Sequence, residues 1–286
     1  MRRVSPNVFA EIYFWGCNPG FVVTTDGVLM IDTPQQPIDA MRWREAMAEH
    51  GKPLYLVNTE WHPDHIRGNA FFPGVEVLGH TKLEQRYNEV APGFTSPEMI
   101  ERMKIDDPDS VHLMGHPDYP PNPITRAFED GLTLEMGSHK IELIHMPGHT
   151  APQTSVFVPS EGIVFTGDNV FHKCRTFVQE GDPWQWLEAL ESIRALDVET
   201  IVPGHGEPCD KAYLDSQGQI LRDWVGAMET LVDKGMTEDE ALKQPCPDVD
   251  PYPIGQHLFA RNDFVTEANM RNVYRQITAR RAAPAS

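Results

Sequence analysis

Short apolar runs that end in polar, glycine-flanked loops constrain the fold of this chain most strongly. The run LYLVN (54–58) leads directly into TEWHPDH, the run GIVF (162–165) leads into TGD, and the residues before PGHG (203–206) are also apolar. Short apolar runs bounded by turn residues are typical of buried strands. In open α/β proteins, functional sites form in the loops at the carboxyl ends of such strands. The pattern therefore predicts an α/β protein with polar loops gathered at strand ends.

A hairpin and a helical crossover are expected in the first part of the chain. Residues 20–33 contain two β-rich runs around an Asp-Gly pair, which is a strong turn signal. Residues 37–51 have the pattern of a helix, and residues 54–58 and 75–79 that of short strands. A strand–helix–strand order implies parallel pairing through a helical crossover.

The second part of the chain has the same order of elements. Strands are expected over 126–137, 139–146, 154–159 and 162–167, with a hairpin at Asp130-Gly131, and helices follow. The predicted helices cover residues 183–196 and 221–235, and the second carries a stripe of core or interface residues: Leu221, Trp224, Val225, Met228, Leu231 and Val232. Two halves of the same kind suggest two sheets packed face to face with helices outside.

We expect residues 1–286 to form a single domain with two additions. Residues 84–124 are rich in proline and acidic residues, and we interpret them as a lid-like insertion, part helix and part loop. A passive surface excursion is an equal alternative. Residues 212–286 form a helical C-terminal segment that could cover a pocket or make a homodimer contact, and it contains His257.

The charge of the chain bears on its partners. With 24 basic and 42 acidic residues, the formal net charge is −18, which argues against nucleic acid as a partner. The same charge is also typical of a well-solvated surface. No stretch approaches the ~18 consecutive apolar residues of a membrane span, and the first residues do not have the pattern of a signal peptide. The cysteines are widely spaced and suggest reduced thiols in a cytoplasmic protein: Cys17, Cys174, Cys209 and Cys246.

The segment EWHPDH concentrates metal-binding side chains. Glu60, His62 and Asp64 alternate in what should be an extended segment, whereas His65 breaks the alternation and can face a second point. The segment can therefore supply two metal ions a few ångströms apart. A pair of histidines in an ordinary surface turn is the alternative interpretation. Three other polar loops, centred on His149, Asp168 and His205, each follow a predicted strand and strengthen the case for a metal site.

Taken together, these motifs resemble those of the metallo-β-lactamase superfamily. The resemblance covers most of residues 8–210 and rests on GFVVTTDGVLMIDT with Asp32, the xHxDH motif, PGHT (147–150), TGD (166–168) and PGHG (203–206). Their order and separations agree with the family. The resemblance implies an α/β fold of the αββα sandwich type, with two mixed β-sheets packed face to face, helices outside and a two-metal site at one edge of the sheets.

The resemblance also implies a role for each residue of the site. His62 and His149 would bind the first metal ion, and Asp168 would bridge the two ions. Asp32 would stand behind the ligands and orient a histidine or a loop, although an ordinary turn aspartate is the alternative. The second metal ion would be bound by three residues: Asp64, His65 and His205.

Glu60 departs from the family pattern, which usually has histidine at this position. A carboxylate oxygen binds zinc at about the same distance as an imidazole nitrogen, so Glu60 could replace one ligand with another. The added negative charge would favour manganese or iron more than three neutral imidazoles would. Two zinc ions are nevertheless the first expectation. In the alternative, Glu60 turns away and only the second ion binds tightly.

The expected activity is that of a metal-dependent hydrolase with a small-molecule substrate. A metal-bound hydroxide, oriented or deprotonated by Asp64 as the catalytic residue, would attack a neutral or apolar lactone, ester, amide or β-lactam. A hydrolytic dehalogenase of haloaromatic compounds and a catalytically altered metal-binding scaffold are the alternatives. The candidates for substrate contact are loop residues for which a surface role is equally compatible: His112, His116, Tyr119 and His172.

Several branches of the superfamily fit this chain less well. Thioesterases of the glyoxalase II type normally keep the first histidine and carry basic residues for glutathione, and no basic cluster is evident before Arg271–Arg281. Nucleases need a surface that accepts polyanions. Persulfide dioxygenases depend on the histidine that Glu60 replaces, and flavodiiron proteins carry an additional flavodoxin domain.

Overall fold

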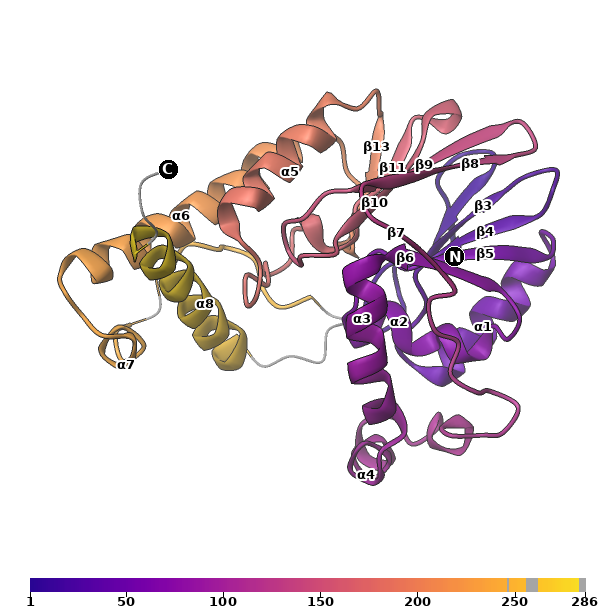
Figure 1. The fold of residues 1–286 in the computed structure, drawn as a ribbon, viewed down its shortest axis with the longest axis horizontal. Helices are drawn as coiled ribbons and strands as arrows, with labels where there is room; N and C mark the ends of the chain where they lie inside the picture. The colour runs from indigo at the N-terminus through magenta and orange to yellow at the C-terminus, as the bar shows by residue number, and fades with distance from the viewer. Residues whose placement is uncertain (246, 256–261, 283–286) are drawn as a thin grey trace.

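Two β-sheets pack face to face between two sets of helices. The computed structural model describes residues 1–245, 247–255 and 262–282, and Figure 1 shows the N-terminal sheet with α1 and α3 on one side and the second sheet with α5 and α6 on the other. The predicted αββα sandwich is confirmed. Of the residues discussed above, Cys246 and His257 lie outside the described residues.

The first sheet is mixed. Its four N-terminal strands run antiparallel to one another, and its last four strands are parallel, with the fourth strand belonging to both groups. The predicted hairpin and the parallel crossover are both confirmed. In order across the sheet the strands are β1 (Arg2–Arg3), β2 (Val8–Ala10), β3 (Gly20–Val23), β4 (Val28–Ile31), β5 (Pro53–Val57), β6 (Glu76–His80) and β7 (Arg126–Phe128).

The second sheet is mostly antiparallel, with one parallel pair at its edge. Its order is β13 (Thr200–Val202), β11 (Ile163–Phe165), β10 (Thr154–Val158), β9 (His139–His145) and β8 (Gly131–Met136). A separate parallel pair joins β12 (Phe171–His172) to β14 (His205–Gly206). This short pair brings the segment after Asp168 beside the PGHG loop.

The prediction of a hairpin at Asp130-Gly131 is wrong. The strand before this turn, β7, pairs with β6 in the first sheet, whereas the strand after it, β8, pairs with β9 in the second. The turn therefore carries the chain from one sheet to the other. An Asp-Gly pair signals a change of direction but not the partner of the next strand.

The helices have the following bounds. They are α1 (Pro37–Ala48), α2 (Pro63–Ile66), α3 (Thr81–Val90), α4 (Pro97–Asp106), α5 (Pro183–Ala195), α6 (Tyr213–Asp233), α7 (Glu238–Ala241) and α8 (Asn262–Ala282), and the short 3-10 helices are η1 (Arg67–Phe71), η2 (Ala91–Thr95), η3 (Val111–Leu113), η4 (Pro159–Glu161) and η5 (Gly167–Asn169). Helix α6 begins eight residues before the predicted start at Leu221. Within the described residues, no helix is both long and apolar enough to cross a membrane.

Three apolar clusters hold the layers together. One lies between the sheets and includes Leu29, Ile141 and Phe165. The second joins the first sheet to α1, α3 and the insertion, and the third joins the second sheet to α5, α6 and α8. The stripe predicted on α6 belongs to the third cluster, with Leu221, Trp224 and Met228 fully buried. Burial of such large side chains contributes roughly 1.5–3 kcal/mol each.

The cysteines that the structure describes are not joined by disulfide bonds. Cys17, Cys174 and Cys209 carry free thiols, and the first two are buried. Burial raises the pKa of the Cys17 and Cys174 thiols. Both therefore stay protonated, as expected of structural cysteines.

Candidate metal centre

Seven side chains from five segments converge at one edge of the two sheets. Each segment follows a strand: the loop after β5, the short helix α2, the turn after β9, helix η5 after β11, and strand β14 after β13. The side chains are those predicted from the sequence: Glu60, His62, Asp64, His65, His149, Asp168 and His205. All are buried or nearly so, and Asp64 is the most exposed of the three carboxylates, with 16% of its side chain accessible.

The first half-site consists of Glu60, His62 and His149. The ring nitrogens His149 Nε2 and His62 Nδ1 face each other at 3.2 Å. Glu60 Oε2 lies only 2.5 Å from His62 Nδ1, and Glu60 Oε1 lies 3.5 Å from His149 Nε2. The carboxylate of Glu60 therefore points into the cluster and not away from it.

The second half-site consists of Asp64, His65 and His205. Asp64 Oδ2 lies 3.3 Å from His205 Nε2 and 3.9 Å from His65 Nε2. Ligand atoms about 2.1 Å from a tetrahedral ion stand roughly 3.4 Å apart. The spacing of this half-site matches that value.

Asp168 stands between the half-sites. Its Oδ1 lies 3.3 Å from His65 Nε2, and its Oδ2 lies 3.3 Å from His205 Nε2 and 3.6 Å from His149 Nε2. Glu60 Oε1 also reaches across, to 3.4 Å from His65 Nε2. Two carboxylates thus contact side chains of both half-sites.

The predicted extended conformation holds at His62 but is wrong from Pro63 onward. Residues Pro63–Ile66 form the helical turn α2, so the side chains of Asp64 and His65 project from consecutive positions of a helix. Pro63 at the first helical position has a φ angle that suits a helix start and lacks the N–H that would be unpaired there. The helical turn directs Asp64 and His65 into the same half-site, whereas Glu60 and His62 remain in the first.

The charges of the cluster call for a cation. Burial opposes the protonated form of His62 and of His205, but Glu60 beside the first and Asp168 beside the second raise their pKa values to about 9 and about 10. Burial likewise opposes the charged form of Asp64, yet His65 and His205 lower its pKa to about 2. The imidazoles thus take up protons to balance buried carboxylates. A metal ion would supply that positive charge directly.

Three buried atoms show that the residues fit a metal. Glu60 Oε1, His65 Nε2 and Asp168 Oδ1 are buried and lack a hydrogen-bond partner among the described residues. Unpaired buried polar atoms are rare in native proteins and call for an explanation such as an ion. His65 Nε2 lies 3.4 Å from Glu60 Oε1 and 3.3 Å from Asp168 Oδ1, and each of the three residues offers a ligand atom within 4.8 Å of the others.

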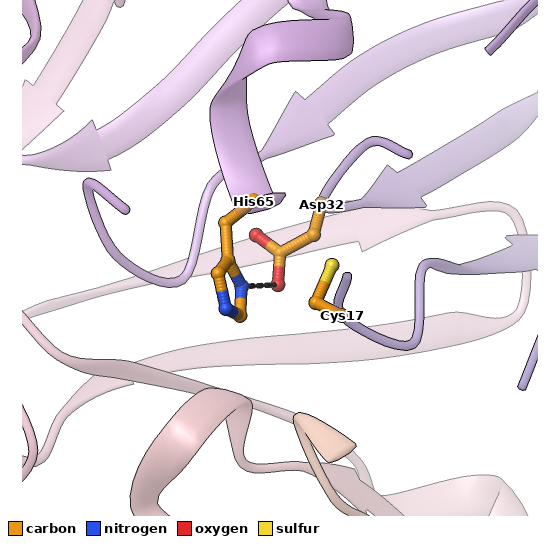
Figure 2. A group of neighbouring side chains, drawn as sticks. All are labelled: Cys17, Asp32 and His65. Carbon is orange, nitrogen blue, oxygen red and sulfur yellow. Dashed lines mark hydrogen bonds and ion pairs between the residues drawn. The ribbon is translucent and has the colours of Figure 1, made fainter. Parts of the chain in front are cut away.

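Asp32 lies directly behind His65. Its Oδ2 accepts a hydrogen bond from His65 Nδ1 at 2.9 Å, and its Oδ1 accepts one from the Thr59 N–H at 2.7 Å. Figure 2 shows the Asp32 carboxylate between the His65 ring and the Cys17 sulfur. Because Nδ1 is held in this way, Nε2 is the nitrogen left to face the cluster. Asp32 has a φ of 53°, a strained left-handed conformation for a residue other than glycine.

Several supporting residues were not found from the sequence. His149 Nδ1 donates to the Phe177 carbonyl at 2.8 Å, and Asn169 Oδ1 accepts from the His149 N–H at 3.0 Å. On the other side, Glu180 Oε2 lies 3.7 Å from His62 Nε2, and Glu180 Oε1 accepts from Trp61 Nε1 at 3.0 Å. Spacing in the sequence gives no signal for these contacts, because each joins distant segments.

Two glycines keep the backbone close to the acidic ligands. A Cβ atom at Gly204 would lie 1.9 Å from Asp168 Oδ1, and one at Gly16 would lie 2.7 Å from Asp64 Cβ. Gly16 also has a φ of +98°. Only glycine fits at these two positions without displacing the carboxylates.

A cavity of about 330 Å³ opens beside the second half-site. His205 and His172 both line it, so His172 lies next to the cluster, as a substrate contact would. His116 and Tyr119 instead line a different cavity, to which none of the seven cluster residues contributes, and His112 is an exposed residue of η3. Of the four residues predicted to contact substrate, only His172 is placed beside the metal centre.

Comparison with known proteins agrees with this geometry. Residues 12–205 match the family model described as the metallo-beta-lactamase superfamily. Among curated proteins, a hydroxyacylglutathione hydrolase of Erythrobacter litoralis is 28% identical over 67% of this chain and 65% of its own length. A linear primary-alkylsulfatase of a Pseudomonas species is 23% identical over 87% of this chain and 53% of its own length. The chain thus spans less than two thirds of these relatives.

Solved structures show the same fold at low sequence identity. The DIM-1 metallo-beta-lactamase has a TM-score of 0.61 at 18% identity and covers 77% of this chain and 95% of its own. The sec-alkylsulfatase Pisa1 from a Pseudomonas species has a TM-score of 0.67 at 14% identity and covers 99% of this chain and 52% of its own. With the family model, the motifs and the fold in agreement, this chain belongs to the metallo-beta-lactamase superfamily.

Proposed function

We propose that this protein is a metal-dependent hydrolase of small molecules with a two-metal site. The observation that carries the proposal is that Glu60 Oε1, His65 Nε2 and Asp168 Oδ1 are buried without a hydrogen-bond partner, with His65 Nε2 3.4 and 3.3 Å from the two oxygens. Each half-site offers two imidazoles and one carboxylate, a ligand set that zinc accepts, and the carboxylates also admit manganese or iron.

The residues around the metal site would have separate roles in catalysis. When bound, two such ions would lower the pKa of a coordinated water to near 7 and polarise the group under attack. Asp64 would orient the nucleophile and take up its proton, because it is the most exposed carboxylate of the cluster and lies beside the open cavity. Asp168, which contacts both half-sites, would keep them at a fixed separation. Asp32 would keep His65 in the tautomer whose Nε2 is free to bind metal.

The cavity beside His205 supports a substrate that is neutral overall. Its wall combines apolar groups such as Ile12 and Ile254 with one lysine, Lys173, and one glutamate, Glu207. The two opposite charges give no net preference for an anion or a cation. Small lactones, esters, amides and β-lactams are compatible with this wall. The names of the relatives add hydroxyacylglutathione and linear primary alkyl sulfates to the substrates worth testing.

Metal analysis and an activity screen test this proposal together. The protein is loaded in turn with zinc, manganese or iron, and its metal content is measured by mass spectrometry. Each form is then assayed on lactones, β-lactams, esters, amides, thioesters, alkyl sulfates and haloaromatics. We expect two equivalents of metal per chain and hydrolysis of at least one class. Absence of bound metal would refute the proposal and favour a scaffold, whereas release of halide alone would favour the dehalogenase alternative.

A further inference from the structure

A second cavity lies between the insertion and the short helices that follow the metal-binding motif. It measures about 320 Å³, which is at the lower end of the range of small-molecule pockets, ~300–1,000 Å³. Its wall is formed by the first residue of α1, by η1, α3 and η2, and by the end of η3 with the segment after it. None of the seven cluster residues lines it, so this cavity is separate from the metal centre.

The wall of this cavity is largely apolar. Aromatic rings approach it from three elements, with Phe71 on η1, Tyr87 on α3 and Phe94 on η2. The Tyr119 ring lies beside that of Phe71, tilted by 44° with ring centroids 4.9 Å apart. Apolar side chains such as Leu113 and Met114 complete the wall. Pockets of this kind bind the apolar body of a ligand and use a few polar groups to orient it.

One cation borders the cavity without a direct ion pair. Arg67 is partly buried, its Nε has no hydrogen-bond partner, and the described carboxylates that act on its charge, Asp64 and Asp107, do so without a salt bridge. Its remaining guanidinium contacts are weak: the sulfur atoms of Met99 and Met103 at 3.8 and 3.9 Å, and the face of Phe94 at 5.4 Å. A buried charge is costly unless it is paired and hydrogen-bonded.

The charged side chain in the wall is a cation. Arg67 lines the cavity, and no aspartate or glutamate contributes to it. Arg44 lies behind the wall, 5.7 Å from the Tyr119 ring and hydrogen-bonded to the Phe71 carbonyl at 3.1 Å, and it also forms no ion pair with a described residue. In a chain with 42 acidic and 24 basic residues, such a wall is selective for anions.

We propose that this cavity binds a small amphiphilic carboxylate, with the apolar body among the aromatic rings and the carboxylate on Arg67. The planar guanidinium matches the geometry of a carboxylate and can donate two parallel hydrogen bonds. The smaller cavity on the other side of Arg67 is lined by Arg102 and Asp106, which pair with each other, so an anion there would meet a carboxylate as well as the two arginines. The inference does not depend on the activity of the metal centre.

Calorimetric titration with matched ligands tests the site. The probes are 4-phenylbutyrate and its neutral amide, added to the protein as purified and after removal of metal by a chelator. We expect the acid to bind in both preparations and the amide to bind at least tenfold more weakly. Equal binding of acid and amide would overturn the proposal. Loss of acid binding after metal removal would also overturn it, because it would place the acid on the metal ions.

Three variants separate the guanidinium from general effects on folding. Arg67→Gln should weaken binding of the acid at least tenfold, and Ala91→Trp, which fills the cavity and leaves Arg67 in place, should weaken it to a similar extent. Arg102→Gln removes the same charge from an exposed residue paired with Asp106 and should leave binding unchanged. If Ala91→Trp and Arg102→Gln both keep full affinity, the acid binds elsewhere and the proposal fails, even if Arg67→Gln does not fold.

Discussion

The two half-sites of the metal centre differ in how their ligands are spaced. In the second, Asp64 Oδ2 and His205 Nε2 stand 3.3 Å apart, a separation that an ion can occupy without displacing either group. In the first, Glu60 Oε2 and His62 Nδ1 already form a contact of 2.5 Å. An ion that enters the first half-site must compete with this charge-assisted hydrogen bond.

This difference gives a physical meaning to the unusual glutamate. Glu60 is longer than the carboxylates of the second half-site, and its two oxygens face different neighbours, His62 through Oε2 and both His149 and His65 through Oε1. Glu60 therefore adds negative charge to the first half-site, and its contacts with these histidines offset part of that charge. We expect the second half-site to bind metal more tightly than the first.

The largest effect should come from the residue that the half-sites share. Asp168→Ala removes contacts to His65, His149 and His205 at once, and it should lower any hydrolytic activity by roughly a thousandfold or more. Metal content should fall below one equivalent per chain. The circular dichroism spectrum serves as the control for folding. Full activity in this variant would refute the two-metal mechanism.

Substitution of Glu60 should affect the half-sites unequally. Glu60→Ala should lower metal affinity at the first half-site by about a hundredfold, whereas Glu60→His should raise zinc affinity there and reduce binding of manganese, because three imidazoles form a softer site. Titration with cobalt, followed by visible absorption, resolves the two events. Unchanged stoichiometry and affinity in both variants would show that Glu60 is not a ligand.

The pH dependence of metal binding should be steeper at the second half-site. Carboxylate neighbours raise the pKa of both His65 and His205, whereas in the first half-site they raise the pKa of His62 and burial lowers that of His149. Metal must displace two protons from the second and one from the first. As pH rises from 6 toward these raised pKa values, affinity should therefore increase more steeply at the second half-site, by at most about a hundredfold per pH unit, than at the first, by at most about tenfold.

The same protons stabilise the folded chain when a chelator keeps metal away. Because the pKa of these histidines is raised on folding, their contribution is complete below the unfolded pKa of ~6.5 and is lost as pH rises through about 9 and about 10. The melting temperature in chelator should therefore fall between pH 7 and pH 10. A rising melting temperature over this range would contradict the assigned protonation.

Removal of the carboxylate behind His65 should have a smaller effect, confined to the second half-site. Asp32→Asn keeps the shape of the side chain but loses the charge that fixes the tautomer of His65, so zinc affinity there should fall ten- to a hundredfold. Asp39→Asn, which alters another buried aspartate that is paired with Arg42, is the matched control. An equal loss in both variants would point to a general effect of a buried charge.

The sequence predicted the polar residues of this centre and the two-sheet fold well. Local patterns sufficed, because each cluster residue lies within a few residues of the end of an apolar strand, and the hairpin over 20–33 has a strong turn signal. It failed where the outcome depends on contacts between distant segments. The strand after Asp130-Gly131 joins the other sheet, and helix α2 gives Asp64 and His65 a direction that alternation alone did not predict.

The cavity beside the insertion was likewise not predictable from the sequence. His116 and Tyr119 were predicted to touch the substrate of the metal centre, but they meet Arg67 and Phe71 in a separate cavity. Arg67 itself carries no sequence signal, since an arginine after a histidine motif is usually solvated and paired. Only its partial burial without an ion pair marks it, and burial is a property of the tertiary structure.

Glu180 is another residue that only the tertiary structure brings to the centre, and its effect should be the smallest. It lies 3.7 Å from His62 Nε2 and is 37% exposed, so solvent screens its charge. Its hydrogen bond to Trp61 holds the carboxylate behind the ring whose Nδ1 faces His149. Glu180→Gln should lower metal affinity at the first half-site two- to fivefold and leave the second unchanged, whereas Glu188→Gln on α5 should alter neither. An equal loss at both half-sites would mean that Glu180 acts through the general charge of the centre, and the asymmetry between the half-sites would then rest on Glu60 alone.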